Sequence, residues 1–148
     1  MCELRVVPFS LEQLDAVERL ERECFSEPWS RAQLEATLTD GKTELFAALL
    51  DGELAGYAGL SFVLDEGSVT DVAVFPQSRR KGVGRALVRM LKDRSREHCL
   101  SFLTLEVRAS NQAAIALYQS EGFLPVGRRR DFYRSPTEDA VLMTWTNA

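Results

Sequence analysis

One stretch of the sequence combines glycines and basic residues in a pattern suited to binding phosphate. Residues 72–85 read VAVFPQSRRKGVGR, an apolar, strand-like run followed by a polar loop. The basic and glycine positions of the loop are Arg79, Arg80, Lys81, Gly82, Gly84 and Arg85. Glycines let backbone amides approach an anion closely, and the first turn of a helix presents unpaired N–H groups and a partial positive charge. The sequence therefore predicts an anion site where this strand passes into a helix.

Two common nucleotide-binding fingerprints do not fit this stretch. The pattern G-x-x-x-x-G-K-[ST] is absent, and Gly82-Val83-Gly84 is followed by Arg85-Ala86-Leu87 where the dinucleotide fingerprint needs a third glycine. ATP and NAD are therefore disfavoured as ligands. For this stretch alone, an ordinary basic helix start with glycine turns remains the alternative.

A second segment, residues 105–123, places a polar and an aromatic residue at a helical spacing. Two helical turns separate Asn111 from Tyr118, so both side chains face the same way. Taken alone, Asn111 is typical of a helix cap and Tyr118 of a half-buried tyrosine that packs on a sheet. Together with the anion site, the pair favours a single ligand that contacts both.

These two segments resemble the signatures of the GCN5-related N-acetyltransferases (GNAT). Arg-x-x-Gly-x-Gly at 79–84 resembles the family's pyrophosphate loop, and Asn111, Tyr118 and the following Gly-Phe resemble its strand-to-helix signature. The resemblance covers nearly the whole chain and extends to the RimI-type ribosomal-protein alanine N-acetyltransferases within the family. The stretches similar to that subfamily are FSEPWS at 25–30, LDE at 64–66, LEVRASN at 105–111, RRDFY at 129–133 and EDA at 138–140.

The resemblance implies that acetyl-CoA is the acetyl donor and that an amine attacks its thioester directly, with no acyl-enzyme and no metal. The implied cofactor-binding residues are Val72, Ala73, Val74, Arg79, Arg80, Lys81, Gly82, Val83, Gly84, Arg85 and Asn111. We expect the main chain of the first three to hold the pantetheine arm as an added strand. A free N–H near Val74 is expected to polarise the thioester carbonyl.

The resemblance also implies two catalytic side chains. Glu106 corresponds to a general base that acts through water, and a carboxylate paired with Arg108 is the alternative interpretation. Tyr118, with a phenolic pKa of about 10, is expected to protonate the departing thiolate. An N-terminal α-amine, with a pKa of about 7.7 to 8.0, needs only a weak base near neutral pH, whereas a lysine has a pKa of about 10.4.

Charge is distributed unevenly along the chain. Residues 1–66 hold 5 basic and 14 acidic residues, a net charge of −9, and residues 67–148 hold 13 and 8, a net charge of +5, within a total of −4. We expect the acidic half, including Glu27, Asp65 and Glu66, to receive the basic N-terminus of a protein, and the basic half to receive phosphate. In the resembled subfamily that partner is ribosomal small-subunit protein number eighteen, which begins with alanine.

Other interpretations stay open. A lysine side chain, a polyamine or an antibiotic amine would suit the same chemistry, and a coenzyme A-binding module would need no turnover. Charged faces without any special partner would also account for the uneven charge. The run Arg128-Arg129-Arg130 would suit nucleic acid, but the acidic balance of the whole chain disfavours nucleic acid as a partner.

The remaining pattern predicts one α+β domain, residues 1–148, with the GNAT fold: a mixed, mostly antiparallel, twisted sheet of about seven strands flanked by four helices. Strands are predicted at 3–7, 45–50, 53–64, 68–75, 100–107, 124–133 and 140–146, and helices at 10–24, just after Trp29, at 82–96 and at 111–121. The order is β-α-α-β-β-β-α-β-α-β-β. Asp51-Gly52 predicts a tight hairpin turn.

Cysteine usage and the start of the chain predict a cytoplasmic location. The three cysteines, Cys2, Cys24 and Cys99, are odd in number and far apart, which disfavours disulfides and a zinc site, and His98 has no second ligand. We expect the cysteines to act as small apolar residues. The start MCELRVVPFSLEQ does not read as a signal peptide, and no run of about 20 apolar residues predicts a membrane span.

Overall fold

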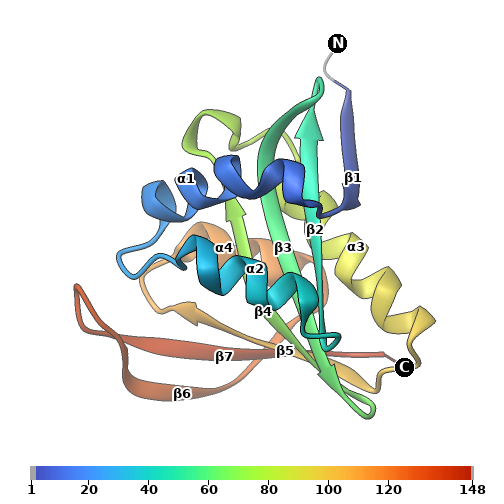
Figure 1. Ribbon diagram of the computed structural model, residues 1–148. Helices are drawn as coiled ribbons and strands as arrows, with labels where there is room; N and C mark the ends of the chain where they lie inside the picture. Colours follow the sequence, from blue (N-terminus) through green and yellow to red (C-terminus); the bar gives the residue numbers. More distant parts are fainter. Residues whose placement is uncertain (1–2, 148) are drawn as a thin grey trace.

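The predicted order of strands and helices is found in the computed structural model, which describes residues 3–147 (Figure 1). The strands are β1 (Leu4–Pro8), β2 (Thr43–Leu50), β3 (Glu53–Val63), β4 (Glu66–Val74), β5 (Phe102–Arg108), β6 (Leu124–Tyr133) and β7 (Glu138–Thr146). The helices are α1 (Leu14–Cys24), α2 (Arg31–Thr39), α3 (Val83–Glu97) and α4 (Gln112–Ser120), with short 3₁₀ turns at Leu11–Gln13 and Pro76–Ser78. Among the described residues, no helix is long and apolar enough to cross a membrane.

The seven strands form one sheet in the order β1-β2-β3-β4-β5-β7-β6, and all neighbouring strands are antiparallel except β4 and β5. The hairpin between β2 and β3 turns at Asp51 and Gly52, with φ of 52° and 86°. Two successive positive φ values are those of a type I′ turn, whose twist matches that of the flanking strands. The prediction of this turn from the dipeptide is confirmed.

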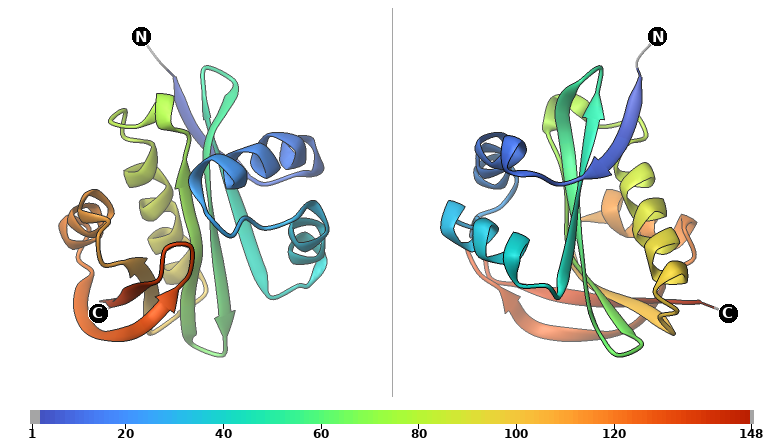
Figure 2. Two further views of the ribbon diagram at one scale, coloured as in Figure 1. Left: turned by 90° about the vertical axis from the view of Figure 1, so that its left-hand side faces the viewer. Right: turned by 45° about the vertical axis from the view of Figure 1, so that its right-hand side comes forward.

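Helices cover both faces of the sheet, α1 and α2 on one side and α3 and α4 on the other (Figure 2). Each pair encloses its own core. The core under α1 and α2 contains Leu14, Val17, Leu20, Leu34, Tyr57 and Phe75. The core under α3 and α4 contains Leu87, Leu91, Leu103, Phe123 and Met143. Burying each of the aliphatic side chains contributes about 1.5–3 kcal/mol, so the apolar stripes of the helices fix their positions on the sheet.

The sheet is interrupted between β4 and β5. The two strands pair only over residues 66–68 and 102–104, and beyond these pairs they diverge. On the other side of β4, the register with β3 shifts by one residue, which leaves Thr70 as a β-bulge. A Cβ at Gly59 would lie 2.1 Å from the Thr70 hydroxyl, so glycine makes room for the bulge. Because a bulge increases the local bend of a strand, β4 turns away from β5 and a wedge opens between them.

Local signals explain several helix ends. The predicted capping box at the start of α2 is present, since Ser30 accepts from the Gln33 N–H at 3.2 Å and Gln33 accepts from the Ser30 N–H at 2.8 Å. Gly122, with φ of 96°, follows α4 as predicted. The first predicted helix differs in its first turn, residues 11–13, which is 3₁₀.

Candidate active site

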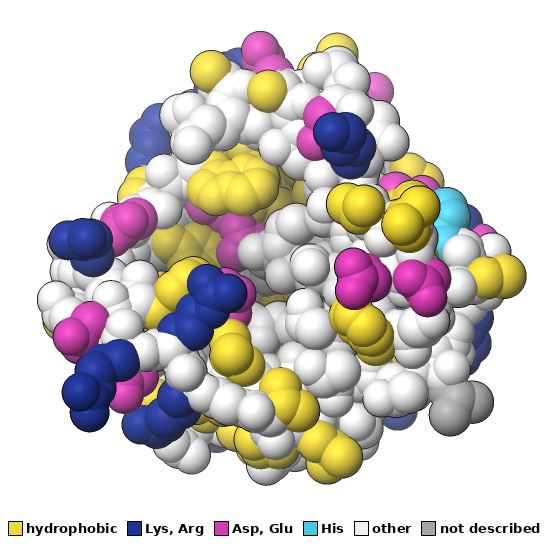
Figure 3. Space-filling view, turned by 90° about the horizontal axis from the view of Figure 1, so that it is seen from below, with side chains coloured by type: hydrophobic (Ala, Val, Ile, Leu, Met, Phe, Trp, Pro, Cys, Tyr) yellow, Lys and Arg dark blue, Asp and Glu magenta, His cyan; other side chains and the backbone are white. Residues whose placement is uncertain are grey.

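The wedge between β4 and β5 holds two adjoining cavities. Cavity A, of about 520 Å³, lies between the α1–α2 loop, β4, β5 and the end of β6. Cavity B, of about 670 Å³, lies between the end of β4, the start of α3 and α4. The residues that line both are Cys24, Phe25, Val72, Asn111, Ala114 and Tyr118. The face of the molecule seen in Figure 3 is hollowed, with hydrophobic and acidic side chains inside the hollow.

The predicted anion loop forms part of the wall of cavity B. After the 3₁₀ turn the chain reverses through Arg80 (φ 64°) and Gly82 (φ 81°), both in the left-handed region. Helix α3 begins at Val83, so its first amides have no acceptor within the helix. A Cβ at Gly84 would lie 3.1 Å from a leucine side chain of α4, so this glycine lets the two helices approach closely. The loop thus presents open amides and a helix N-terminus to the cavity.

The basic side chains of this loop have different surroundings. Arg79 and Arg80 are exposed and line cavity B, and within residues 3–147 no carboxylate lies within ion-pair distance of either. Arg79 donates through Nε to a main-chain carbonyl of β4 at 3.3 Å. Arg85 also lines cavity B, but its guanidinium is paired with Glu121. Lys81 lies outside the linings of both cavities.

The main chain of residues 72–74 is open toward the wedge, because this end of β4 has no β5 partner. Phe75 donates its N–H to the Ala55 carbonyl of β3 at 2.9 Å. Since main-chain groups alternate in direction along a strand, the N–H groups of Val72 and Val74 point away from β3. The Val74 carbonyl, on the same side, accepts a hydrogen bond from the thiol of Cys24 at the end of α1, with 3.4 Å between sulfur and oxygen. Two main-chain N–H groups therefore face the cavities, whereas the main chain of Ala73, which was also expected to hold the pantetheine arm, faces β3.

Asn111 and Tyr118 lie on one side of α4, as their spacing predicts, and both line both cavities. Asn111 caps the helix by accepting from the Ala114 N–H at 3.2 Å. Tyr118 is 7% exposed, and none of the hydrogen bonds found within residues 3–147 involves its hydroxyl. Burial, and then the charges of Asp71 and Tyr133, raise the pKa of Tyr118 above its ordinary range. Its hydroxyl therefore stays protonated at neutral pH.

Glu106 is exposed on β5 and lines cavity A, and no hydrogen bond or ion pair joins its carboxylate to another residue between 3 and 147. The alternative interpretation, a pair with Arg108, is not formed. Arg108 lies 3.2 Å from the Glu138 carboxylate and donates to the carbonyls of Arg134 at 2.8 Å and Pro136 at 2.9 Å. The Glu106 carboxylate is therefore available to a ligand in cavity A.

Two carboxyl groups in the wall of cavity A, one buried and one half-buried, were not predicted from the sequence. Glu21 is 1% exposed and accepts from the Trp29 N–H at 2.8 Å, while Asp71 lies beside it on β4. A signal for Glu21 existed, because it falls on the apolar stripe of α1, where a charged residue is unusual. Asp71 had no such signal, since a strand of mixed composition gives no expectation for a single position.

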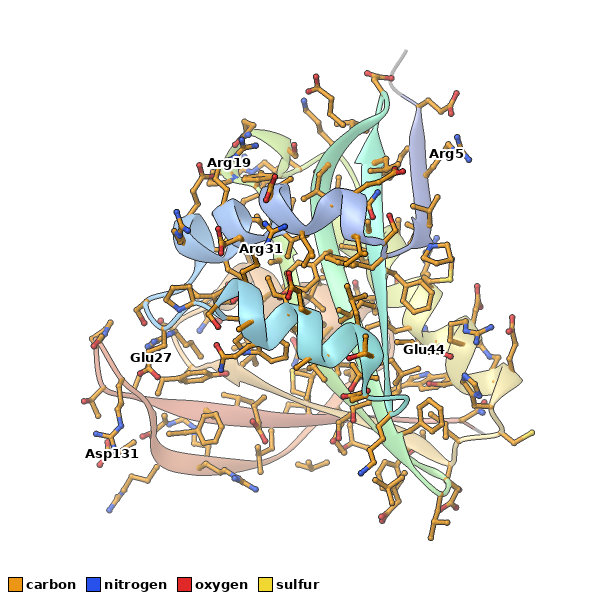
Figure 4. All side chains as sticks on the ribbon, viewed as in Figure 1. Arg5, Arg19, Glu27, Arg31, Glu44 and Asp131 are labelled. Carbon is orange, nitrogen blue, oxygen red and sulfur yellow. The ribbon has the colours of Figure 1, made fainter. Side chains whose placement is uncertain are left out.

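Of the three acidic residues expected to receive a basic peptide, Glu27 alone lines cavity A. It lies in the α1–α2 loop, on the side of the molecule where β6 turns into β7 (Figure 4). Asp65 and Glu66 lie at the β3–β4 turn, at the closed end of the wedge, where Asp65 accepts from the Ser101 hydroxyl at 2.6 Å. These two residues therefore do not form part of either cavity.

Of the cysteines and the histidine considered in the sequence, only Cys24 lies at the cavities among the described residues. Cys24 lines both cavities, and burial raises the pKa of its thiol although Arg79 opposes the change. His98 lies at the end of α3 with Nε2 at 2.9 Å from the Glu44 carboxylate. Cys99 is exposed, and Cys2 lies outside the described residues.

Comparison with known proteins finds a family and close relatives. Residues 14–123 match the model of the acetyltransferase (GNAT) family. The ribosomal protein bS18-alanine N-acetyltransferase of Escherichia coli K12 is 39% identical over 141 residues, which cover 90% of this chain and 93% of that protein. The putative enzyme of the same name from Bacillus subtilis is 34% identical, covering 90% and 89%. The N-alpha-acetyltransferase RimI of Mycobacterium tuberculosis is 38% identical, covering 84% and 80%.

Solved structures show the same fold. The crystal structure of the ribosomal-protein-S18-alanine N-acetyltransferase from Escherichia coli superposes with a TM-score of 0.89 at 34% identity, covering 97% of this chain and 94% of that one. A GNAT acetyltransferase from Elizabethkingia anophelis with acetyl-CoA bound superposes with a TM-score of 0.77 at 18% identity, covering 97% of each chain. The predicted fold class is confirmed.

Proposed function

Since the chain belongs to the GNAT family of acetyltransferases, we propose that it transfers the acetyl group of acetyl-CoA to the N-terminal α-amine of a protein that begins with alanine. The acceptor we propose is ribosomal protein bS18, the substrate named for the relatives that share 34% and 39% of their aligned residues with this chain. One observation carries the proposal: two adjoining cavities share Tyr118, one beside an amide-rich basic loop and the other beside an unpaired carboxylate.

Cavity B has the chemistry that coenzyme A requires. Its diphosphate would be held by the open amides at the start of α3 and by Arg79 and Arg80, which have no carboxylate partners among the described residues. Its amide-containing pantetheine arm would pair with the main chain of Val72 and Val74. Lys81 lies outside the cavity, and Arg85 is paired with Glu121. In the proposed loop these two residues therefore contribute positive potential and do not bind the diphosphate directly.

Each catalytic group has one task in the proposed reaction. The nitrogen of the acceptor forms a bond to the acetyl carbon, and the bond between that carbon and sulfur breaks. Glu106 takes the proton lost by the amine, through a water molecule, and Tyr118 gives a proton to the thiolate that leaves. The Val74 N–H donates to the carbonyl oxygen while that oxygen bears negative charge.

The relatives and the charge of cavity A favour an N-terminal α-amine as the acceptor. Glu27 and Glu106 line the cavity, and its one arginine is engaged by Glu138 and two carbonyls. This surplus of negative charge suits a cationic peptide. An α-amine also has a lower pKa than lysine, so the exposed Glu106 carboxylate suffices as a base near neutral pH.

Acetylation of a peptide panel tests the proposal. The peptides share one basic sequence with an internal lysine and begin with alanine, serine, leucine or a propionyl group that lacks the α-amine. We expect a mass gain of one acetyl group, localised to residue one, that is fastest for the alanine peptide and absent for the propionyl peptide. Acetylation of the propionyl peptide on lysine, or no acetylation of any peptide, would refute the proposal.

A further inference from the structure

Two carboxyl groups in the wall of cavity A, one buried and one half-buried, have no task in the reaction described above. Glu21, near the end of α1, accepts hydrogen bonds from the Tyr57 hydroxyl at 2.5 Å and the Trp29 N–H at 2.8 Å. Asp71, on β4, lies with Oδ2 at 3.1 Å from the same Tyr57 hydroxyl. Three elements, α1, β3 and β4, therefore converge on one acidic pair beside the cavity.

The two carboxyl groups of this pair share the hydroxyl of Tyr57. Burial, and then the charge of Glu21, hold the pKa of Asp71 well above its ordinary range. Burial, followed by the charges of Asp71 and Glu21, also raises the pKa of Tyr57, so the phenol keeps its one proton and donates it to one carboxyl at a time. Two carboxyl groups that share one phenol and have no cation beside them hold one proton between them, so the pair carries a single negative charge.

Across residues 3–147, no Lys, Arg or His nitrogen lies within 4.0 Å of a carboxyl oxygen of Glu21 or Asp71. The other titratable groups in the wall of the cavity are Cys24, Glu27, Glu106, Arg108, Tyr118 and Tyr133. Burial raises the pKa of Tyr133 to about 12, so it is uncharged, and Arg108 is engaged by Glu138 and two carbonyls.

A buried charge without a counter-ion is costly to the fold, so its presence in a cavity wall points to a ligand that supplies the positive charge. A second observation indicates a ligand in the same place. The Tyr118 hydroxyl belongs to a side chain more than nine-tenths buried, and no hydrogen bond joins it to the described residues. The α-ammonium group of a protein N-terminus, with a pKa of about 7.7 to 8.0, is mostly charged at pH 7 and supplies both charge and donors.

We propose that Glu21 and Asp71 share one negative charge that binds the α-ammonium group of the acceptor before its proton passes to Glu106. The pair then determines specificity for cationic amines, and it takes no part in breaking the thioester. The inference rests on the proposed function, because it needs an acceptor amine in cavity A. It adds that the amine enters charged, and that the charge is recognised at a place separate from the base.

Paired peptides measure this recognition without catalysis. One peptide begins with alanine and the other with a propionyl group, which has the same shape but no amine, and binding of each to the protein with coenzyme A is measured by calorimetry at pH 7. We expect the wild-type protein to bind the alanyl peptide at least about tenfold more tightly. In the double variant Glu21→Gln/Asp71→Asn, which keeps the sizes of the side chains and one acceptor oxygen on each but has no carboxyl, we expect the preference to fall to within about twofold.

Single variants and a matched control separate charge from structure. Glu21→Gln and Asp71→Asn each leave one carboxyl that can ionise, so each should lower the preference by less than about threefold, and the loss in the double variant should exceed their product. The control Glu12→Gln/Glu53→Gln removes two exposed carboxyls that have no partner among the described residues, and it should keep the full preference. Retention of a tenfold preference by the double variant, with coenzyme A affinity intact, would overturn the inference.

The wild-type protein offers a second measurement in case the double variant does not fold. The preference for the alanyl peptide should disappear between pH 7 and pH 9.5, as the peptide amine loses its charge. Equal binding of the two peptides at pH 7, or an unchanged preference at pH 9.5, would contradict the inference. If the wild-type protein acetylates the alanyl peptide and yet shows no binding preference, the inference fails and the proposed function stands.

Discussion

Replacement of Tyr118 by phenylalanine should separate catalysis from stability. The hydroxyl is the only group removed, and it has no hydrogen-bond partner within residues 3–147. The ring, which lies 5.9 Å from the Phe123 ring, is retained. We therefore expect the free energy of unfolding to change by less than about 0.5 kcal/mol, because no native hydrogen bond is lost.

The expected loss of activity is much larger. A positioned general acid contributes about 10²–10⁴ in rate, so kcat should fall by at least about 100-fold, while the dissociation constant of coenzyme A should change by less than about twofold. Steady-state kinetics with the alanyl peptide gives kcat, and calorimetry gives the affinity for coenzyme A. Thermal unfolding gives the stability.

Tyr57→Phe is the matched control, because the same atom is removed from another buried tyrosine. Its hydroxyl bonds Glu21 at 2.5 Å and Asp71 at 3.1 Å, so its loss should destabilise the protein by about 1–3 kcal/mol. At about 3 °C per kcal/mol, Tm should fall by roughly 3–9 °C. Wild-type kcat in Tyr118→Phe would exclude Tyr118 as the acid, and a Tm loss in Tyr118→Phe as large as in Tyr57→Phe would show that its hydroxyl is structural.

Two further variants test the base and the ion pairs of Glu121. Glu106→Gln should lower kcat by roughly 10²-fold, most strongly at acidic pH where the amine most needs a base, and an equal loss across a pH–rate profile from 6 to 9 would instead indicate a structural role. Burial alone would raise the pKa of Glu121, but hydrogen bonds from Arg89, Arg85 and Lys92 outweigh it and hold that pKa below its ordinary range. Because the folded pKa is the lower one, this stabilisation is present above the unfolded pKa of about 4.3 and is lost as pH falls through the folded value. Glu121→Gln should therefore be about 1–2 kcal/mol less stable than wild type in urea at pH 7, with the difference shrinking below pH 4, and a difference independent of pH would refute the assignment.

Local signals predicted the elements of this fold well. The dipeptide Asp51-Gly52, the capping box at Ser30 and the glycine after α4 each act over a few residues, so the sequence contains all the information that they need. The position of Asn111 and Tyr118 on one side of α4 follows from helical geometry in the same way.

Long-range contacts were beyond the reach of such signals. The hydrogen bonds of Tyr57 with Glu21 and Asp71 join residues 36 and 14 positions apart, and only the packing of α1 on the sheet brings all three together. The partner of Arg108 was uncertain for the same reason, since Glu138 belongs to a strand 30 positions away. Glu66 was expected near a peptide, but the three strand pairs at the closed end of the wedge place it elsewhere.

The bulge at Thr70 and the short pairing of β4 with β5 have a consequence for how sequences of this kind can diverge. A binding surface made of main-chain N–H and C=O groups has no side chain that a point mutation could delete. The side chains of Val72 and Val74 pack against the core under α3 and α4, so other apolar residues that fit there could replace them while the chain keeps its register. Among single substitutions, only a change to proline would remove one of these N–H groups outright, so drift among apolar residues and retention of the chemistry are compatible over long evolutionary times.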